Sequence, residues 1–315
     1  MKKNDKKKYP RYLPLYYLIF LIIRKVYRQS LVRILERKAR ISGPRGITPD
    51  GNAIWSQPGS DLSAQRAAIN KSARWIDEDM KAPAVQSICH GIYLLKQEME
   101  RRGLAYCSPA GIFKSTTYLD RTERTKNWEN CWMIAHSGVR EGKRVLDLGG
   151  ASTVFAFYLA SIGCDVDVVD NDWGNCGTVF NTNYVAYKMG WHLKAHDIDL
   201  ARRLPFPDNC FDHIFSVCVI EHLPSAVRAF MMSEVGRLLK PGGVAGLTTD
   251  YVKDRDVLLF DKGLRFAYFD KLRREIIDPS GLQIYGNQDF VDAIGPDENF
   301  LGAFFLQKEM RQGTV

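Results

Sequence analysis

Residues 141–310 of this 315-residue chain predict an α/β domain with a doubly wound, mainly parallel sheet of seven strands. Two observations carry the prediction. From Gly142 onward, short apolar runs alternate with segments of helical periodicity, which is typical of β-α-β units. The first apolar run also ends in an acidic residue and two glycines before a helix begins, and acidic residues end the next two runs. An N-terminal helical extension precedes this domain.

The expected strands are short runs rich in Val, Ile, Leu and Phe, as is usual for strands buried in a parallel sheet. They cover residues 145–148, 165–169, 191–195, 211–217, 243–248, 283–285 and 301–306. Helices are expected over 152–162, 175–189, 225–239 and 264–277, and before the domain over 62–80, 84–102 and 127–137. Residues 41–62 are rich in Gly, Pro, Ser and Asp and predict irregular structure. We therefore expect residues 41–140 to form a linker and a helical cap.

The excess of basic over acidic residues is confined to the N-terminus of the chain. Residues 1–40 carry thirteen Lys or Arg against two acidic residues, whereas residues 41–315 hold 31 basic and 34 acidic side chains. Non-specific affinity for phosphates needs a concentrated basic face. The body of the protein therefore gives no electrostatic reason to expect nucleic acid as a partner.

The N-terminal 40 residues predict a membrane-associating segment. Residues 12–23 are uncharged and largely apolar, but they are shorter than the roughly 20 residues that a helix needs to span a bilayer. No small-residue cleavage site follows, which disfavours a signal peptide. Basic residues flank the stretch on both sides, which favours a helix on an anionic membrane surface and a cytoplasmic protein held at the inner face of the membrane. A helix packed on the protein's own body and a short or tilted anchor are the alternatives.

The seven cysteines are scattered and never form a C-x-x-C pair. This spacing is typical of reduced cytosolic thiols rather than of a disulfide framework or a zinc site, and no metal centre is expected.

The turn after the first strand is the first candidate binding site. Gly149 and Gly150 follow Asp147, and glycine allows a tight turn and a close approach of the backbone to a ligand. Asp170 ends the second strand 23 positions after Asp147, where a carboxylate can accept both hydroxyls of a ribose. These features alone also suit dinucleotide-binding enzymes.

Further ordered blocks make the pattern more specific. They read V-L-D-L-G-G, V-D-V-V-D, H-D-I, L-P-F-P-D-N-C-F-D, I-E-H-L and L-L-K-P-G-G within residues 142–250. In this order they resemble the class I S-adenosylmethionine-dependent methyltransferase family, in its branch acting on small molecules, lipids and sugars. The resemblance implies a Rossmann-like seven-stranded sheet and S-adenosyl-L-methionine as the cofactor.

The resemblance also implies roles for single residues. The methionine part of the cofactor would be lined by Asp147, Gly149, Gly150 and Ala151. Ala151, with Ser152 and Thr153, stands where the family has further glycines, but it is small enough for the same turn. The remaining cofactor contacts would come from Asp170 at the ribose, Asn171 or Asp172 beside the adenine, Asp197 and Ile198 at the adenine, and Val217 and Cys218 beside the sulfonium.

A hydroxyl acceptor requires a base, and His222 is the first candidate because imidazole titrates near neutrality. Glu221 and Asp250 are the further candidates. Residues 124–132 and the C-terminal tail resemble bacterial methyltransferases linked to surface-glycan synthesis, which would bring Trp128, Glu129 and Trp132 near the cofactor, with core packing as the favoured role of Trp132. With the basic N-terminus, this resemblance predicts O-methylation of a membrane-associated, saccharide or lipid-linked small molecule.

Other interpretations remain open at this point. Asp170 can be a helix cap, Asp197 an exposed loop acid, and Glu221 with His222 a packed structural pair. A nicotinamide-dependent oxidoreductase would need a fuller G-x-G-x-x-G, and a catalytically inactive scaffold on the membrane would transfer no methyl group.

Overall fold

The computed structural model of the chain describes residues 67–72, 76–108, 111–112, 121–171, 177–250, 273–288 and 301–310. The predicted membrane-associating segment at residues 1–40 lies outside these ranges, as do the linker to residue 66 and most of the helix expected over 264–277. None of the helices in the described ranges is long and apolar enough to cross a membrane.

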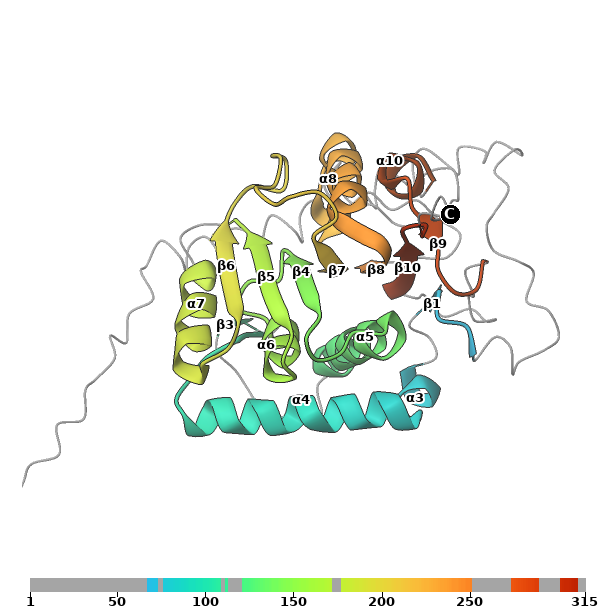
Figure 1. The fold of residues 1–315 in the computed structure, drawn as a ribbon. Helices are drawn as coiled ribbons and strands as arrows, with labels where there is room; N and C mark the ends of the chain where they lie inside the picture. The colour runs from blue at the N-terminus through green and yellow to red at the C-terminus, as the bar shows by residue number, and fades with distance from the viewer. Residues whose placement is uncertain are drawn as a thin grey trace, which may run out of the picture. The chain divides into compact units, whose positions relative to one another are not determined.

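A mixed sheet with the order β1-β10-β8-β7-β4-β5-β6 occupies the centre of the described residues, and β9 pairs with β10 (Figure 1). The pairs from β8 to β6 are parallel, whereas β10 runs antiparallel to β8. The strands are β1 (Lys71–Ser72), β4 (Arg144–Leu148), β5 (Asp165–Asp170), β6 (Leu193–Asp197), β7 (Phe211–Val217), β8 (Leu239–Asp250), β9 (Gln283–Ile284) and β10 (Leu301–Gln307). All seven predicted strands form, so the doubly wound, mainly parallel sheet is confirmed.

Helices cover both faces of this sheet. In Figure 1, α4, α5 and α6 lie on one side, and α8 and α10 lie on the other. The helices are α3 (Ile76–Asp79), α4 (Pro83–Arg101), α5 (Arg121–Ser137), α6 (Val154–Ser161), α7 (Thr178–Met189), α8 (Ser225–Leu238) and α10 (Asp278–Ser280). A 3-10 turn, η3 (Ile220–His222), follows β7, and a π-turn, η4 (Arg273–Ile277), precedes α10. A separate two-stranded sheet joins β2 (Cys107–Ser108) to β3 (Gly111–Ile112).

The two faces of the sheet bury two apolar clusters. Successive side chains of a strand point to opposite faces. Val145 and Phe215 accordingly belong to the cluster under α4, α5 and α6, whereas Leu146 and Ile214 belong to the cluster under α8. Burial on both faces explains why the strands are short, nearly continuous apolar runs.

The helix expected over residues 62–80 is wrong in its middle. Residues 71–72 instead form β1, an edge strand paired with Ala303 and Gly302 of β10. The side chain of Asn70 donates to the carbonyls of Tyr285 and Asn287 (2.9 and 2.7 Å) and accepts from the backbone N–H of Phe305 (2.8 Å). These contacts join residues more than 200 positions apart, so local periodicity does not register them.

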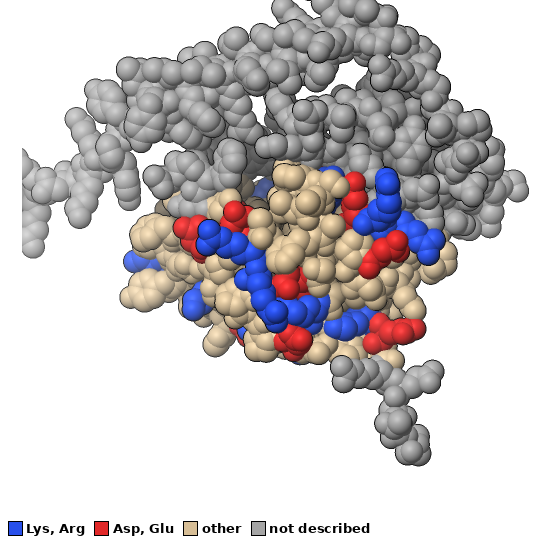
Figure 2. All heavy atoms as spheres, turned by 90° about the horizontal axis from the view of Figure 1, so that it is seen from above, with Lys and Arg blue, Asp and Glu red and all other residues tan. Residues whose placement is uncertain are grey.

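The described surface drawn in Figure 2 carries Lys and Arg side chains interspersed with Asp and Glu. Charges of both signs therefore alternate on this face instead of forming a field of one sign.

Candidate active site

Three carboxylates lie at one edge of the sheet. Asp147, Asp170 and Asp197 stand at or next to the carboxyl ends of β4, β5 and β6, which are adjacent parallel strands. Asp170 and Asp197 are direct register partners, and Asp147 pairs with Val168. Residues 50 positions apart in the sequence are thus brought to the same end of neighbouring strands, where α/β sheets bind their ligands.

The turn after β4 requires glycine at two successive positions. Gly149 has a φ of +83°, in the left-handed region, and its N–H donates to the carbonyl of Val169 (2.8 Å). A Cβ on Gly149 would lie 2.5 Å from Cγ2 of Val219, and a Cβ on Gly150 would lie 1.8 Å from Oδ2 of Asp147. Because neither glycine has a Cβ, the Asp147 carboxylate and the side chain of Val219, which follows β7, can lie directly against the turn.

Asp147 is buried with unsatisfied hydrogen-bonding capacity. The residue is only 1% exposed, and neither carboxylate oxygen has a hydrogen-bond partner among the described residues. Burial, together with the negative charge of Asp170, raises the pKa of Asp147 to about 8. A buried carboxylate without a donor is costly. Such a group fits a site whose ligand brings a cation or a hydrogen-bond donor.

Asp170 holds the turn in place. Its Oδ2 accepts a hydrogen bond from the N–H of Ala151 (3.1 Å). Thr153 caps α6, because its hydroxyl accepts from the N–H of Ala156 (3.4 Å) and donates to the carbonyl of Gly150 (2.8 Å). Asp170 therefore contacts the turn directly, in addition to the ribose role that the resemblance implies.

Ser152, one of the positions where the sequence lacks a glycine, adopts a left-handed φ of 64°. Side chains of α7 hold it there: Asn181 donates from Nδ2 to the Ser152 hydroxyl (2.6 Å), and the hydroxyl of Thr182 accepts from the Ser152 N–H (2.6 Å). Its carbonyl accepts from the N–H of Cys107 (2.6 Å). Hydrogen bonds from residues outside the turn thus hold Ser152 in a backbone conformation that glycine adopts more readily.

Glu129 of α5 accepts hydrogen bonds from a residue at the end of β7 and from a residue of β8. Its side chain is fully buried, and its Oε1 accepts from the thiol of Cys218 (2.7 Å) and from the hydroxyl of Thr248 (2.7 Å). Its Oε2 lies 2.8 Å from Nζ of Lys126. Cys218 itself has a left-handed φ of 54°, and its N–H donates to the carbonyl of Thr248 (3.1 Å).

These charges determine the protonation of the cluster. Burial, and then the negative charges of Glu129 and Glu221, hold the pKa of the Cys218 thiol well above its ordinary value, so the thiol stays neutral. Burial, the largest single effect, lowers the pKa of Lys126, but the charges and hydrogen bonds of Glu129 and Cys218 together outweigh it, and the pKa lies above its ordinary value. Lys126 therefore remains a cation that compensates Glu129.

The candidate base lies just beyond this cluster. The His222 side chain is 67% exposed, and its Nε2 lies 3.9 Å from Oε1 of Glu221, whose side chain is buried. Both residues belong to η3, which follows directly on the end of β7. Asp250 is the last residue of β8, and its side chain lies outside what the structure describes.

The remaining cofactor candidates surround the same edge. Asn171 is half-buried after β5, Asp197 is exposed at the end of β6, and Ile198 is half-buried behind it, with its N–H donating to the carbonyl of Asp170 (2.9 Å). Val217 ends β7. The structure therefore brings these residues to one edge of the sheet, and Asp172 lies outside the described residues.

Of the upstream residues, Glu129 lies at this edge but the tryptophans belong to the core. Trp128 is fully buried and donates from Nε1 to Oδ2 of Asp79 (2.8 Å), and its ring stacks on Trp132 at 5.7 Å. Asp79 also pairs with the buried ammonium of Lys71. Sequence reasoning missed Thr248 and Lys126. Thr248 stands at the end of a predicted strand, which is the signal that could have identified it.

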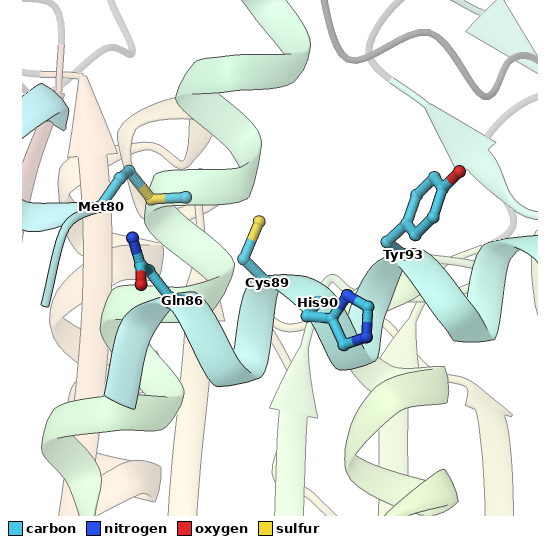
Figure 3. Close-up of a pocket in the computed structure, with 5 residues that line it drawn as sticks. All are labelled: Met80, Gln86, Cys89, His90 and Tyr93. Carbon is cyan, nitrogen blue, oxygen red and sulfur yellow. The ribbon is translucent and has the colours of Figure 1, made fainter. Parts of the chain in front are cut away.

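A cavity of about 420 Å³ opens elsewhere, along α4 (Figure 3). Its lining residues are Met80, Gln86, Cys89, His90 and Tyr93. None of them belongs to the predicted site. Among the described residues, no group of three or more His, Cys, Asp and Glu side chains is placed to hold a metal ion.

The glycine turn, the orphaned carboxylate of Asp147 and the strand-end acids define a nucleotide-cofactor-binding α/β domain. Residues 146–247 match a family model described as a methyltransferase domain. This part of the chain is a class I S-adenosylmethionine-dependent methyltransferase domain, with S-adenosyl-L-methionine as its cofactor. The predicted methyltransferase family, fold and cofactor are confirmed, whereas the branch linked to surface-glycan synthesis stays a prediction.

Curated relatives match between about a third and a half of this chain. The chain is 34% identical over 120 residues to a sterol 24-C-methyltransferase of Pneumocystis carinii, covering 36% of this chain and 29% of that protein. It is 34% identical over 115 residues to a ubiquinone/menaquinone biosynthesis C-methyltransferase of Pseudomonas fluorescens, covering 35% of this chain and 43% of that one. The matches span less than half the length of these relatives.

Solved structures are similar over part of the chain. A SAM-dependent methyltransferase from Aquifex aeolicus aligns with a TM-score of 0.39 and 18% identity, over 54% of this chain and 84% of that one.

Proposed function

We propose that this protein is an active methyltransferase that O-methylates a membrane-associated, saccharide or lipid-linked small molecule. The observation that carries the proposal is the buried, unpartnered carboxylate of Asp147 beside two obligatory glycines. A site of this kind fits the ammonium-bearing methionine end of S-adenosylmethionine.

The cofactor would be held at the edge formed by β4, β5, β6 and β7. Asp147, Gly149, Gly150 and Ala151 would contact its methionine end. The ribose and adenine would lie against Asp170, Asn171, Asp197 and Ile198, and Val217 and Cys218 would border the sulfonium. When bound, the cofactor supplies an electrophilic methyl group.

The protein's own part in the reaction is alignment and proton transfer. Methyl transfer is an in-line displacement, which gains from orientation and from exclusion of water. During transfer the hydroxyl proton of the acceptor would pass to Nε2 of His222 and from there to water. The exposed position of His222 beyond the end of β7 suits an acceptor that arrives from outside.

His222 is tested by substitution with a matched control. His222→Ala should lower turnover at least ~100-fold, the low end of general-base effects, while cofactor affinity persists. His192, an exposed histidine before β6, provides the control, and His192→Ala should leave turnover unchanged. Unchanged turnover in His222→Ala removes this residue from the mechanism and leaves Glu221 and Asp250 as candidates.

Transfer to carbon is the second candidate function, because the two relatives described above carry the name C-methyltransferase. Incubation of the protein with labelled S-adenosylmethionine and fractionated lipid, glycan and protein extracts distinguishes the two. The ¹³C chemical shift of the transferred methyl group separates a methyl on oxygen from one on carbon. Label in no fraction would refute the enzyme proposal and favour a catalytically inactive scaffold.

Residues 1–40 are the proposed membrane-associating segment of a cytoplasmic protein at the inner face of the membrane. Deletion of these residues should release most of the protein from sedimenting membranes. An unchanged membrane-bound fraction would contradict the proposal.

A further inference from the structure

An aromatic face on α7 is exposed to solvent. The large apolar residues with substantial exposure among the described residues are Leu94, Phe180, Tyr184, Tyr187, Phe230 and Met310. Three of these six belong to α7: Phe180 is 73% exposed, Tyr184 43% and Tyr187 81%. Their spacing of four and three residues places them on one stripe of the helix. Clustered exposure of this kind marks an interaction surface, whereas single exposed apolar residues need no explanation.

Helix α7 packs against the sheet through the side opposite the aromatic stripe. Thr182, Val185 and Ala186 are buried, and α7 packs along β6. The aromatic stripe is thus not required for the core. Its rings are nevertheless ordered: Phe180 stacks on Tyr184 at 6.3 Å, and Nζ of Lys188 lies 5.6 Å from the centre of the Tyr184 ring.

The charge of α7 is of one sign. Residues 178–189 contain no Asp or Glu, and Lys188 is exposed. Phe can insert among acyl chains, Tyr favours the interface between lipid and water, and Lys pairs with anionic headgroups. The face is therefore complementary to an anionic lipid surface.

We propose that the α7 face, formed by Phe180, Tyr184, Tyr187 and Lys188, binds the surface of an anionic membrane. This contact is separate from the one proposed for residues 1–40. Because Asn181 and Thr182 of the same helix hold Ser152 in the cofactor turn, docking through α7 would keep the cofactor edge next to the bilayer.

The test is partition of the full chain onto vesicles of equal parts phosphatidylcholine and phosphatidylglycerol, measured by flotation. Phe180→Ser with Tyr187→Ser should weaken partition at least ~10-fold, which corresponds to about 1.4 kcal/mol. Leu94→Ser with Phe230→Ser removes exposed apolar side chains from α4 and α8, and this control should partition like the unchanged chain. Far-UV circular dichroism and cofactor affinity should be the same in all three proteins.

Hydrogen exchange locates the contact within the full chain. Vesicles should slow amide exchange over residues 177–190 but not over α8. Unchanged partition of the α7 variant, or no added protection in this helix, overturns the proposal. Light scattering tests whether the face binds a second copy of the chain instead. If the unchanged chain is a dimer and the α7 variant is a monomer with unchanged partition, the face belongs to a dimer interface and the proposal is overturned. Because the readout is lipid binding, failure here is distinct from failure of the proposed methyl transfer.

Discussion

Substitution of Asp147 by Asn is expected to stabilise the cofactor-free protein at neutral pH. The two side chains have the same shape, but the amide has no charge to bury. The carboxyl has an ordinary pKa of 3.8, and its pKa in the folded protein is raised to about 8 by burial and by Asp170. The folded state therefore favours the protonated form.

The direction of the pH dependence follows from these two values. Below pH 3.8 the carboxyl is protonated in both states, and Asp147 carries no ionisation penalty. As the pH rises from 3.8 toward 8, the unfolded chain releases the proton and the folded protein retains it, so the free energy of unfolding falls. Each pH unit costs about 1.4 kcal/mol, which gives roughly 2 kcal/mol at pH 5 and roughly 4 kcal/mol at pH 7.

Urea unfolding followed by tryptophan fluorescence measures this difference. Asp147→Asn should exceed the unchanged protein in free energy of unfolding by a margin that grows from pH 5 to pH 7. Asp165→Asn, which alters a carboxylate whose side chain is 62% exposed, is the control and should show no such growth. A margin that is equal at both pH values, or a variant that is less stable at pH 7, would refute the reasoning.

The same substitution should weaken cofactor binding, because the ligand would lose its ionic partner. In the unchanged protein a bound ammonium group favours the carboxylate form, so binding at pH 7 should release a proton. Calorimetry in two buffers of different ionisation enthalpy detects that proton, and Asp147→Asn should abolish its release.

Other substitutions probe the surroundings of the site. Gly150→Ala places a Cβ 1.8 Å from Oδ2 of Asp147 and should weaken cofactor binding at least ~10-fold in a calorimetric titration; normal affinity would contradict the role of the turn. Glu129→Ala leaves two donors and a cation without their partner and should lower the free energy of unfolding by about 3 kcal/mol, with a smaller loss for Glu129→Gln. Arg228→Met strands the carboxylate of Glu275, which lies 2.6 Å from the guanidinium, and should cost about 3 kcal/mol. The double variant that also replaces Glu275 by Met should recover part of that loss, and additive losses would rule out this coupling.

The strand ends of the site could be predicted from sequence because the signal is local. Asp147, Asp170 and Asp197 each follow an apolar run, and parallel strands in a doubly wound sheet bring such ends together. The Glu129 cluster could not be assembled in the same way, because its hydrogen bonds join residues 89 and 119 positions apart. No local pattern states which buried thiol or hydroxyl a helical carboxylate will meet.

The same distinction explains the edge strand β1. A strand of two residues has too little alternation to be recognised, and the surrounding sequence has helical periodicity. The strand forms because Asn70 saturates backbone groups of β10 and of the residues after β9. Tertiary hydrogen bonds thus override the local preference.

Helix α7 contacts the cofactor turn on one side and carries the aromatic face on the other. Its inward side chains, Asn181 and Thr182, hold Ser152 in a left-handed conformation that an L-residue adopts at a cost of about 1–2 kcal/mol. Its outward side chains form the aromatic face. A chain with glycine at residue 152 would need no such support and would leave the cofactor turn independent of α7. The serine makes the turn depend on the position of this helix, so a surface that fixes α7 also fixes the backbone next to Asp147.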